Sequence, residues 1–549
     1  MLPEPLRGYS SYREWLEAEE EFKGRVVFAR LLPKAPPRPA PYEGAFAGVL
    51  RALGLTPYLH QPRALTRVEA GANVVLAYPT AAGKSLVYQA PVLQAALEGA
   101  TSLLLFPTKA LAHDQLRRLR AMAQVLGVEG VFPYDGDTPS ATRRQARERG
   151  LVLLSNPDML HYGLLPRHPD WAPFLARLRY VVLDELHAYR GVFGTHVALI
   201  LRRLLRLARH YGASPQVLAA SATIANAREH AEALTGLPFE ELKAQVARTE
   251  RELLVLLPKP LDRRGERRRS PLLEAAYLAR RLAEAGLKGL VFAGARKSAE
   301  LIARYAAHPL VRPYRAGYTA RERRRLEADL KEGRVRVLVS TSALELGVDI
   351  GELDAVVLVG YPGSTAAFWQ RAGRAGRGER RALLVYIPRE DPMDEYFLHR
   401  PALLLESPPE EAVADPQNPV LCPLHLHAAA REKPLLAEEL LCPEARATLK
   451  ERNGRFFTPK RNPHREITLR GLGATFTLRG PDGEVLGYLD ERQAYWEAHP
   501  GAIYLHQGES YLVRNVDLAR REVWLLPALE DYYTEPRAET DLEVLSGEE

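Results

Sequence analysis

Short apolar runs that alternate with segments of helix length occupy most of the chain from residue 53 to about residue 390. The first series consists of residues 73–78, 102–106, 151–154, 180–183 and 216–220. Each run is rich in Leu, Val and Ala and is too short for a helix, as expected for strands that are buried on both faces. Strands and amphipathic helices that alternate at this spacing predict βαβ units in a parallel sheet.

A second series of the same kind follows a basic segment at residues 263–269, which we interpret as a solvated loop. Its apolar runs are residues 289–293, 335–339, 355–359 and 382–387. A chain of 549 residues is too long for one ordinary domain. We therefore expect an N-terminal helical extension at residues 1–52 and two tandem α/β domains at residues 53–247 and 248–408.

The regular alternation of strands and helices stops beyond residue 405, where prolines mark a linker. A helix is predicted over residues 425–441, followed by short alternating segments. These segments are residues 466–469, 475–478, 485–489, 510–513 and 522–526. The pattern predicts a smaller α+β accessory region at residues 409–549.

The composition is that of a globular protein, with 46% hydrophobic and 26% charged residues. Lys and Arg number 75 against 68 Asp and Glu, and the net charge of +7 is compatible with nucleic-acid binding without requiring it. Cys422 and Cys442 have no metal-ligand spacing, and so few cysteines fit a reducing cytosol. Residues 1–10 contain no apolar core, and no apolar run is long enough to span a membrane. We expect a cytoplasmic protein with no signal peptide.

Two adjacent carboxylates, Asp184 and Glu185, come directly after the β-branched run at residues 180–183. The carboxyl ends of parallel strands are where open α/β sheets bind ligands. One carboxylate at such a place can hold Mg²⁺ while its neighbour positions or deprotonates a water. For the pair alone a solvated acidic turn is the alternative, and the motifs elsewhere in the chain decide against it.

A loop of small residues at positions 80–85 joins the first strand to the next helix. Small residues let backbone N–H groups approach phosphates, and the helix points its N-terminus at them. Lys84 is expected to neutralise the β- and γ-phosphates, and the Ser85 hydroxyl to ligate Mg²⁺. The loop departs from the full phosphate-loop pattern because Tyr78 stands at its first glycine position. Gln61 lies upstream, where a glutamine that recognises adenine is expected.

Polar groups also follow the second and third strands of the first domain. They are Pro107, Thr108 and Lys109 in one case, and Ser155 and Asn156 in the other. Hydroxyl, amide and backbone donors at strand ends can hold a sugar-phosphate backbone without reading bases, although each group alone is as consistent with a helix cap. Ser221-Ala222-Thr223 closes the fifth strand and could link the two sites.

The second domain contributes a segment with two arginines, Arg374 and Arg377, separated by small residues and preceded by Gln370. The i, i+3 spacing puts both arginines on one face if the segment is helical. Two such arginines that reach a triphosphate held by the other domain meet the requirement for an arginine finger. A surface basic helix is the alternative, but it does not explain the interleaved Gly and Ala.

This ordered set of motifs resembles the superfamily 2 helicases, which have two RecA-like domains. More narrowly, the chain resembles the DEXH-box family of mitomycin repair factor A, bacterial and fungal relatives of RecQ4-type helicases. The segments that carry this resemblance are residues 184–194, 317–318, 322–324, 425–426 and 499–511, with Asn418. The family usually continues into a module that holds zinc through four cysteines, a set that this sequence does not contain.

The resemblance implies a role for each matching residue. The expected catalytic residues are Lys84, Glu185, Gln370, Arg374 and Arg377. The expected ATP-binding residues are Gln61, Thr80, Ala81, Ala82, Gly83, Lys84, Ser85, Asp184, Gly347 and Asp349, with Ser85 and Asp184 holding Mg²⁺. The expected nucleic-acid contacts are Pro107, Thr108, Lys109, Ser155, Asn156, Arg296 and Thr341. The expected coupling residues are His187, Ser221 and Thr223.

By this resemblance we expect an ATP-dependent 3′→5′ DNA helicase or translocase in DNA repair, with a winged-helix-like module in the accessory region. Its partners would be single-stranded and tailed duplex DNA, and we expect a monomer that needs no membrane. The alternative is an ATP-driven switch that remodels RNA or nucleoprotein complexes without processive DNA unwinding. The residues do not separate these alternatives, since such helicases contact mainly phosphates.

Overall fold

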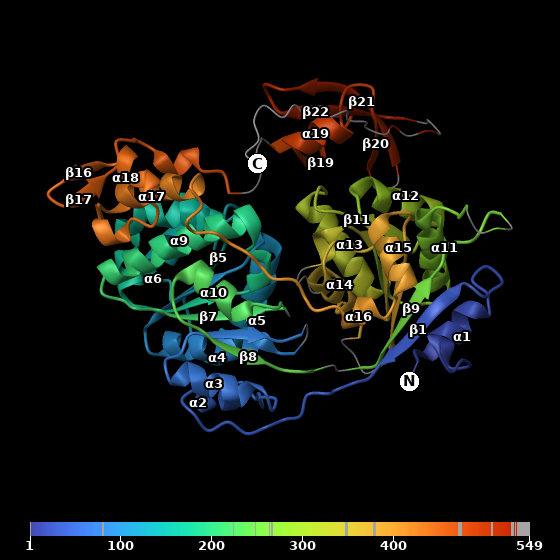
Figure 1. Cartoon of the computed structure of the whole chain (residues 1–549), viewed down its shortest axis with the longest axis horizontal. Helices are drawn as coiled ribbons and strands as arrows, with labels where there is room; N and C mark the ends of the chain where they lie inside the picture. Colours follow the sequence, from blue (N-terminus) through green and yellow to red (C-terminus); the bar gives the residue numbers. More distant parts are fainter. Residues whose placement is uncertain are drawn as a thin grey trace, which may run out of the picture. The chain divides into compact units, whose positions relative to one another are not determined.

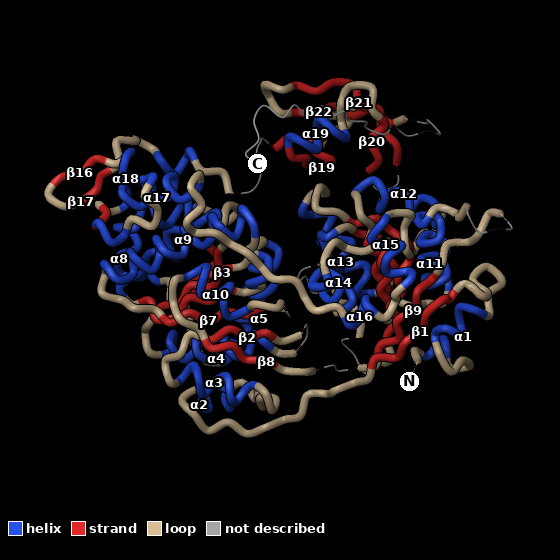
Figure 2. The backbone as a smooth tube through the Cα atoms, viewed as in Figure 1, coloured by secondary structure: helices blue, strands red, loops and turns tan. Residues whose placement is uncertain are grey.

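The structure is a computed structural model (Figures 1 and 2). It describes residues 2–79, 82–222, 224–246, 249–262, 264, 267–345, 350–376, 380–469, 475–506, 509–528, 532 and 534. The chain forms two compact units, one of Met1–Leu257 with Leu344–Arg470 and the other of Pro258–Ala343 with Gly471–Glu549. Both units are discontinuous in sequence, and the boundaries that we expected at residues 52, 247 and 408 stay a prediction.

A parallel sheet of seven strands forms the centre of the first unit, in the order β4-β5-β3-β6-β7-β2-β8. The strands are β2 (Val74–Ala77), β3 (Thr101–Leu105), β4 (Val131–Tyr134), β5 (Val152–Ser155), β6 (Leu178–Leu183), β7 (Gln216–Ser221) and β8 (Glu240–Lys243). The five predicted strands are confirmed. The two edge strands were missed, since β4 contains Pro133 and β8 is mostly polar, so that neither reads as an apolar run.

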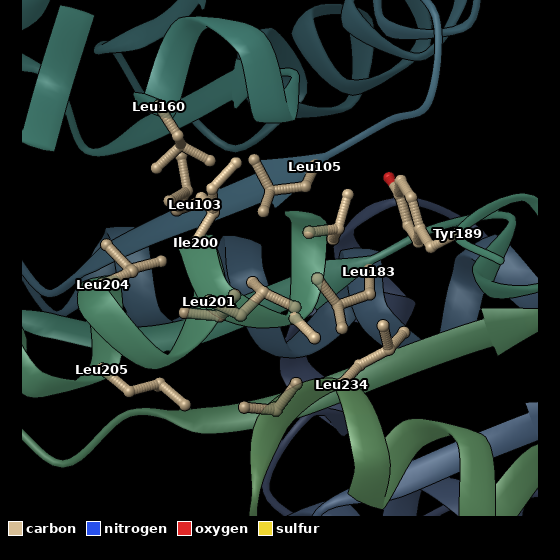
Figure 3. Close-up of a cluster of buried hydrophobic side chains, with 14 of the residues drawn as sticks. Leu103, Leu105, Leu160, Leu183, Tyr189, Ile200, Leu201, Leu204, Leu205 and Leu234 are labelled. Carbon is tan, nitrogen blue, oxygen red and sulfur yellow. The ribbon is translucent and has the colours of Figure 1, made fainter. Parts of the chain in front are cut away.

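Helices connect these strands and cover both faces of the sheet. They are α2 (Ala47–Ala52), α3 (Gln61–Glu69), α4 (Lys84–Leu97), α5 (Lys109–Val125), α6 (Ser140–Arg149), α7 (Pro157–Met159), η2 (Leu160–Leu164), η3 (Leu165–Trp171), α8 (Ala172–Ala176), η4 (Leu186–Ala188), α9 (Gly191–His210) and α10 (Ala227–Thr235). Leu103 and Leu183 pack with Leu204 of α9 in one apolar core, part of which is drawn in Figure 3. Leu104 and Val182 belong to the core on the other face, because successive side chains of a strand point to opposite sides.

The strands of the second α/β series fall into two groups, one in each unit. Those in the first unit lie in the order β1 (Val26–Leu32), β9 (Arg251–Leu256), β14 (Ala382–Ile387) and β13 (Ala355–Val359). β1 is antiparallel to β9, whereas β9, β14 and β13 are parallel. The helices near them in sequence are η1 (Glu4–Leu6), α1 (Tyr12–Glu17), α14 (Thr365–Ala372), α15 (Pro392–His399) and α16 (Leu403–Glu406).

The N-terminal extension was expected to be helical: α1 and α2 are helices within it, and β1 is a strand that was not expected. The run at residues 26–32 is rich in Val and Leu, and Phe28 pairs in register with Val255. A carboxylate on β9 also holds the start of α1, because Glu252 accepts hydrogen bonds from the backbone N–H groups of Tyr12 at 3.0 Å and Arg13 at 2.9 Å.

In the second unit β12 (Val337–Ser340) lies between β10 (Gly289–Phe292) and β11 (Val311–Tyr314), and both pairings are parallel. The helices of this part are α11 (Pro271–Glu284), α12 (Arg296–Ala306) and α13 (Ala320–Glu332), and η5 (Ser342–Leu344) follows β12. The expected strands at residues 289–293 and 335–339 are confirmed within one or two residues.

The α+β accessory region is present, and its two parts belong to different units. The first contains α17 (Leu421–Glu432), η6 (Ala437–Glu439), α18 (Glu444–Thr448), η7 (Pro463–Glu466) and a sheet of β15 (Leu435–Leu436), β17 (Arg455–Phe457) and β16 (Lys450–Arg452). The second contains α19 (Glu491–Glu497) and a mixed sheet in the order β19 (Val485–Asp490), β18 (Thr475–Arg479), β22 (Glu522–Pro527), β21 (Glu509–Asp517) and β20 (Ile503–His506).

Two further expectations concern the environment of the chain. The structure joins Cys422 and Cys442 by a disulfide, so the cysteines that suggested a reducing cytosol are paired with each other. Within the described ranges, no helix combines the length and the apolar character needed to cross a bilayer. Localisation in the cytoplasm stays a prediction.

Candidate nucleotide-binding site

Two backbone carbonyl groups at strand ends hold the side chain of Lys84, the first residue of α4. The Nζ atom of Lys84 donates hydrogen bonds to the carbonyl oxygens of Tyr78 at 3.1 Å and Ser221 at 3.0 Å, which joins the ends of β2 and β7. Gly83 precedes the helix with φ of 79°, and a Cβ atom there would lie 2.5 Å from Nε2 of Gln61. The positive φ therefore favours glycine, and any larger residue would also displace the side chain of Gln61. Thr80 and Ala81 lie outside the described residues.

Gln61 is buried beneath this loop. Its Oε1 accepts a hydrogen bond from the backbone N–H of Tyr58 at 2.7 Å, and its Nε2 donates to the carbonyl of Gly83 at 2.8 Å. The neighbouring His60 ring contacts the carbonyl of Ala82 at 2.8 Å. The structure thus gives Gln61 a role in holding the phosphate loop, which the sequence alone did not indicate, and adenine recognition stays a prediction.

Asp184 follows β6 directly and contacts α4. Its Oδ2 accepts a hydrogen bond from the hydroxyl of Tyr88 at 2.9 Å, and its Oδ1 accepts one from the backbone N–H of Glu185 at 2.9 Å. Burial and the charge of Glu185 raise the pKa of Asp184, and Lys84 opposes that shift. Tyr88 was missed in the sequence, although it follows Lys84 by four residues and so lies on the same face of α4.

The backbone at Glu185 is strained. Its φ is 51°, in the left-handed region that a residue with a side chain seldom adopts. Such strain persists only where the surroundings hold it, and it concentrates at functional sites. Here it turns the chain sharply after β6, so that Oε2 of Glu185 lies 3.5 Å from Nε2 of His187.

His187 links the acidic pair to the segment after β7. Its Nδ1 accepts a hydrogen bond from the backbone N–H of Ala222 at 3.0 Å, and the hydroxyl of Ser221 lies 3.4 Å from the same atom. Burial lowers the pKa of His187 to about 4, so the ring is neutral and carries its proton on Nε2. That nitrogen contacts the side-chain amide of Gln370. Of the two atoms of the amide, only the oxygen can accept a hydrogen bond from this N–H group. The amide oxygen of Gln370 is therefore assigned to the side that faces His187. Thr223 lies outside the described residues.

The arginine segment corrects one expectation about its shape. α14 ends at Ala372, so Arg374 lies beyond the helix and the argument from a shared helical face does not hold. Gly373 caps the helix with a φ of −68°, which is still helical, and the chain has left the helical conformation by Gly376, whose φ is 81°. The guanidinium of Arg374 donates to the carbonyl of Glu345 from Nε at 3.0 Å and Nη2 at 2.5 Å. Gly347, Asp349 and Arg377 lie outside the described residues.

The expected nucleic-acid contacts of the first domain have local structural partners. Thr108 and Asn156 cap α5 and α7, and each accepts a backbone N–H three residues ahead. Lys109 donates to Asp137 at 2.8 Å. Ser155 is buried, and its hydroxyl donates to the carbonyl of Tyr134 at 2.6 Å, so its side chain supports the sheet. Pro107 joins β3 to α5. The nucleic-acid roles of these residues stay predictions.

In the second unit, Arg296 begins α12 and Thr341 follows β12 directly. Nη1 of Arg296 is buried and has no hydrogen-bond partner among the described residues. A buried guanidinium nitrogen in that state costs free energy unless another group satisfies it. Burial raises the pKa of the Glu497 carboxyl, and the charge of Arg296 opposes that shift. The nucleic-acid roles of Arg296 and Thr341 stay predictions.

Comparison with known proteins identifies the class. Residues 58–231 match the family model for the DEAD/DEAH box helicase, and residues 273–379 match that for the helicase conserved C-terminal domain. The ATP-dependent helicase YprA of Bacillus subtilis is 37% identical over 516 residues, which cover 89% of this chain and 69% of the relative. The helicase hrq1 of Schizosaccharomyces pombe is 32% identical, and the chain spans 47% of its length.

Solved structures give the same result. A crystal structure of the DUF1998 helicase MrfA bound to DNA has a TM-score of 0.87 and 34% identity, over 96% of this chain and 74% of that one. Another, bound to DNA and AMPPNP, also has a TM-score of 0.87, over 95% of this chain and 77% of that one. The fold and the nucleotide site define an ATP-dependent helicase with two RecA-like domains. Within that class the chain belongs to the family of YprA and MrfA, which also includes the Hrq1 helicases.

Proposed function

We propose that this chain is a DNA helicase or translocase that moves 3′→5′ along one strand and acts in DNA repair. The ATP-driven part of the proposal is carried by the continuous set of contacts around the acidic pair, and the polarity and the role in repair rest on the resemblance of the sequence to its family. The set of contacts runs from Lys84 and Tyr88 on α4 through Asp184 and His187 to Gln370 on α14. DNA as the substrate is supported by the relatives whose structures contain it.

Asp184 and Ser85 are the residues that would hold Mg²⁺. Both interact with the hydroxyl of Tyr88, so they lie around one point. Two adjacent carboxylates at that point, with a raised pKa at Asp184, form a donor set that a hard divalent cation suits. When bound, ATP would supply the phosphoryl group, and Mg²⁺ would neutralise part of its charge.

The chain's own groups then have separate tasks. Lys84 is placed to exchange its two carbonyl partners for phosphate oxygens. Glu185 orients a water for attack and accepts its proton. Gln370, Arg374 and Arg377 stabilise charge that develops in the transition state. His187, which touches both Gln370 and Ala222, transmits the state of the site to the segment after β7.

A strand-displacement assay tests the substrate and the polarity together. Duplexes with a 3′ tail, a 5′ tail or no tail would be offered as DNA and as matched RNA, with Lys84→Ala as the inactive control. The proposal expects ATP-dependent displacement of the 3′-tailed DNA alone. Displacement of RNA only, or ATPase without displacement, would instead favour a switch that remodels RNA or nucleoprotein complexes.

The role in repair, the oligomeric state and the localisation of the protein need separate measurements. A deletion strain should lose viability after treatment with a DNA-crosslinking agent, and the wild-type gene but not a Lys84→Ala allele should restore it. We also propose a monomer that works in the cytoplasm. Light scattering of the purified chain and fractionation of cells would check these two points.

A further inference from the structure

The segment between α16 and α17 includes a strap, which we define as residues 410–415 (Figure 1). It contacts three places in the first unit that lie far from one another in sequence. These are the start of α14, the loop between β7 and α10, and the start of α9. No motif in the sequence pointed to it.

Glu410 joins the strap to α14. Its Oε1 accepts a hydrogen bond from the backbone N–H of Thr365 at 2.5 Å, and its Oε2 accepts one from Ala366 at 3.1 Å. The hydroxyl of Tyr361 lies 3.4 Å from Oε1. The carboxylate thus satisfies the first two N–H groups of α14, which have no partner within the helix, and its charge complements the helix dipole.

The backbone of the same segment is fastened to the loop after β7. The N–H of Ala225 donates to the carbonyl of Glu410 at 3.3 Å. The side-chain amide of Asn226 forms two hydrogen bonds of 2.9 Å with the backbone N–H and carbonyl of Ala412. Ala412 is buried in the apolar core that includes Leu183 and Leu204.

The last part of the strap is held by the start of α9. The N–H of Gly191 donates to the carbonyl of Val413 at 2.6 Å, and the N–H of Asp415 donates to the hydroxyl of Thr195 at 2.9 Å. A Cβ atom at Gly194 would lie 3.3 Å from that of Ala414, so the two backbones approach closely. The strap is therefore anchored at both ends and along its length.

The same loop after β7 also reaches α14 by a second route. Ala222 donates to Nδ1 of His187, whose Nε2 contacts Gln370 near the end of α14. Glu410 holds the beginning of that helix, and its carbonyl is bound only three residues further along the loop, at Ala225. The two ends of the helix are thus linked, through Glu410 and His187, to the backbone N–H groups of Ala225 and Ala222.

We propose that Glu410 is a positioning residue for ATP hydrolysis, which holds α14 in the register that places Gln370 on His187. The inference rests on the proposed catalytic role of the residues that α14 and the following turn carry. Glu410 does not touch the reacting atoms in this arrangement. It acts through the helix, as the rigid support that a site needs to keep its groups in productive geometry.

The test compares Glu410→Ala and Glu410→Gln with Glu411→Gln, which removes an adjacent exposed carboxylate. Steady-state ATPase at saturating single-stranded DNA should show a kcat lower by roughly 10- to 100-fold for Glu410→Ala, the scale of a misplacement on the order of 1 Å. The KM for ATP should change by no more than about threefold, because the ATP-binding groups on α4 are untouched. Glu410→Gln, which keeps an acceptor for one N–H, should fall in between. Glu411→Gln should match the wild type.

A double-mutant cycle separates positioning from general stability. If Glu410 acts through α14, its removal should cost little further activity in a Gln370→Ala background, so the two effects should be strongly non-additive. Independent effects that multiply would overturn the inference, as would a kcat for Glu410→Ala within about twofold of wild type. Circular dichroism checks that each variant is folded. ATPase activity that persisted in the Lys84→Ala variant would instead contradict the assignment of the nucleotide site, on which this inference rests.

Discussion

The hydroxyl of Tyr88 donates a hydrogen bond of 2.9 Å to Oδ2 of Asp184. Both side chains are buried, at 1% and 7% exposure, so water does not compete for the contact. Burial and the charge of Asp184 raise the pKa of Tyr88, which keeps the phenol protonated as a donor. The helix that carries Lys84 therefore also orients the carboxylate expected to hold the metal.

Removing that hydroxyl should damage the site without collapsing it. Tyr88→Phe leaves a buried carboxylate with one fewer donor, a loss of about 1.5–3 kcal/mol for a hydrogen bond to a charged group. We expect a lower thermal midpoint and a higher concentration of Mg²⁺ for half-maximal ATPase. A Mg²⁺ titration identical to that of the wild type would show that Tyr88 does not orient the metal ligand.

Lys84→Ala should remove nearly all ATPase activity while the fold is retained. Lys84 is the only lysine of the phosphate loop, and Ala removes its charge from the site. ATPase at saturating single-stranded DNA is the measurement, and circular dichroism is the control for folding. Near-normal turnover in a folded variant would show that Lys84 is not part of the ATP-binding site.

Glu185→Gln should separate binding from hydrolysis. Asp184 and not Glu185 is assigned to the metal, so binding of ATP·Mg²⁺ and of DNA should remain. Hydrolysis should fall by roughly 10²–10⁴, the contribution of a general base. Equilibrium binding of a fluorescent ATP analogue checks the first half of this prediction. Loss of that binding would require the two carboxylates to exchange roles.

Acid should weaken the first unit through its buried histidines. His161 accepts a hydrogen bond from Nη1 of Arg203 at 2.9 Å, and its Nε2 lies 2.9 Å from the carbonyl of His464. Burial, with the charge of Arg203, lowers the pKa of His161 to about 3, so the unfolded chain binds a proton that the folded one does not. This stabilisation is complete above the unfolded pKa of about 6.5 and is lost progressively as the pH falls toward 3.

His161→Gln should make that loss shallower. The contribution of one such group is at most about 1.4 kcal/mol per pH unit. Thermal midpoints of the variant and the wild type between pH 7 and pH 4.5 are the measurement. Two parallel curves would show that His161 is not a source of the pH dependence.

The hairpin of β16 and β17 offers exposed basic residues for nucleic acid. Lys450, Arg452 and Arg455 surround its tip and are all exposed. Replacing the three by Ala should reduce the slope of log K against log salt by about 0.9 for each phosphate that the protein no longer neutralises. Thermal stability and ATPase without nucleic acid should not change. An unaltered salt slope would assign these charges to a solvated face.

A truncation near residue 405 is not a clean test of the accessory region. Ala412, Ala428 and Ile467 belong to the same apolar core as Leu183 in the first unit. Their removal would expose that core, and it would also delete Glu432, which is buried and pairs with Arg203 on α9. Changes of exposed charge are therefore preferable to deletion here.

The sequence alone determined most of the strands and the residues of the phosphate loop and the acidic pair. Buried strands appear in it as short apolar runs, and the chemistry of phosphate binding requires Gly83, Lys84 and Ser85 to be neighbours. Such features depend on residues that are close in sequence. They can be recognised without knowing what the rest of the chain does.

Only the tertiary structure decided which distant groups support the site. Glu410 caps a helix that begins 45 residues earlier, and Ala412 pairs with Asn226 across 186 residues. Neither contact produces a hydrophobic periodicity or a local motif in the sequence, because a single polar side chain can bind a backbone group from any part of the chain. The disulfide and the pairing of β1 with β9 are further long-range contacts of this kind. Each depends on what packs against the segment, and the sequence of the segment does not contain that information.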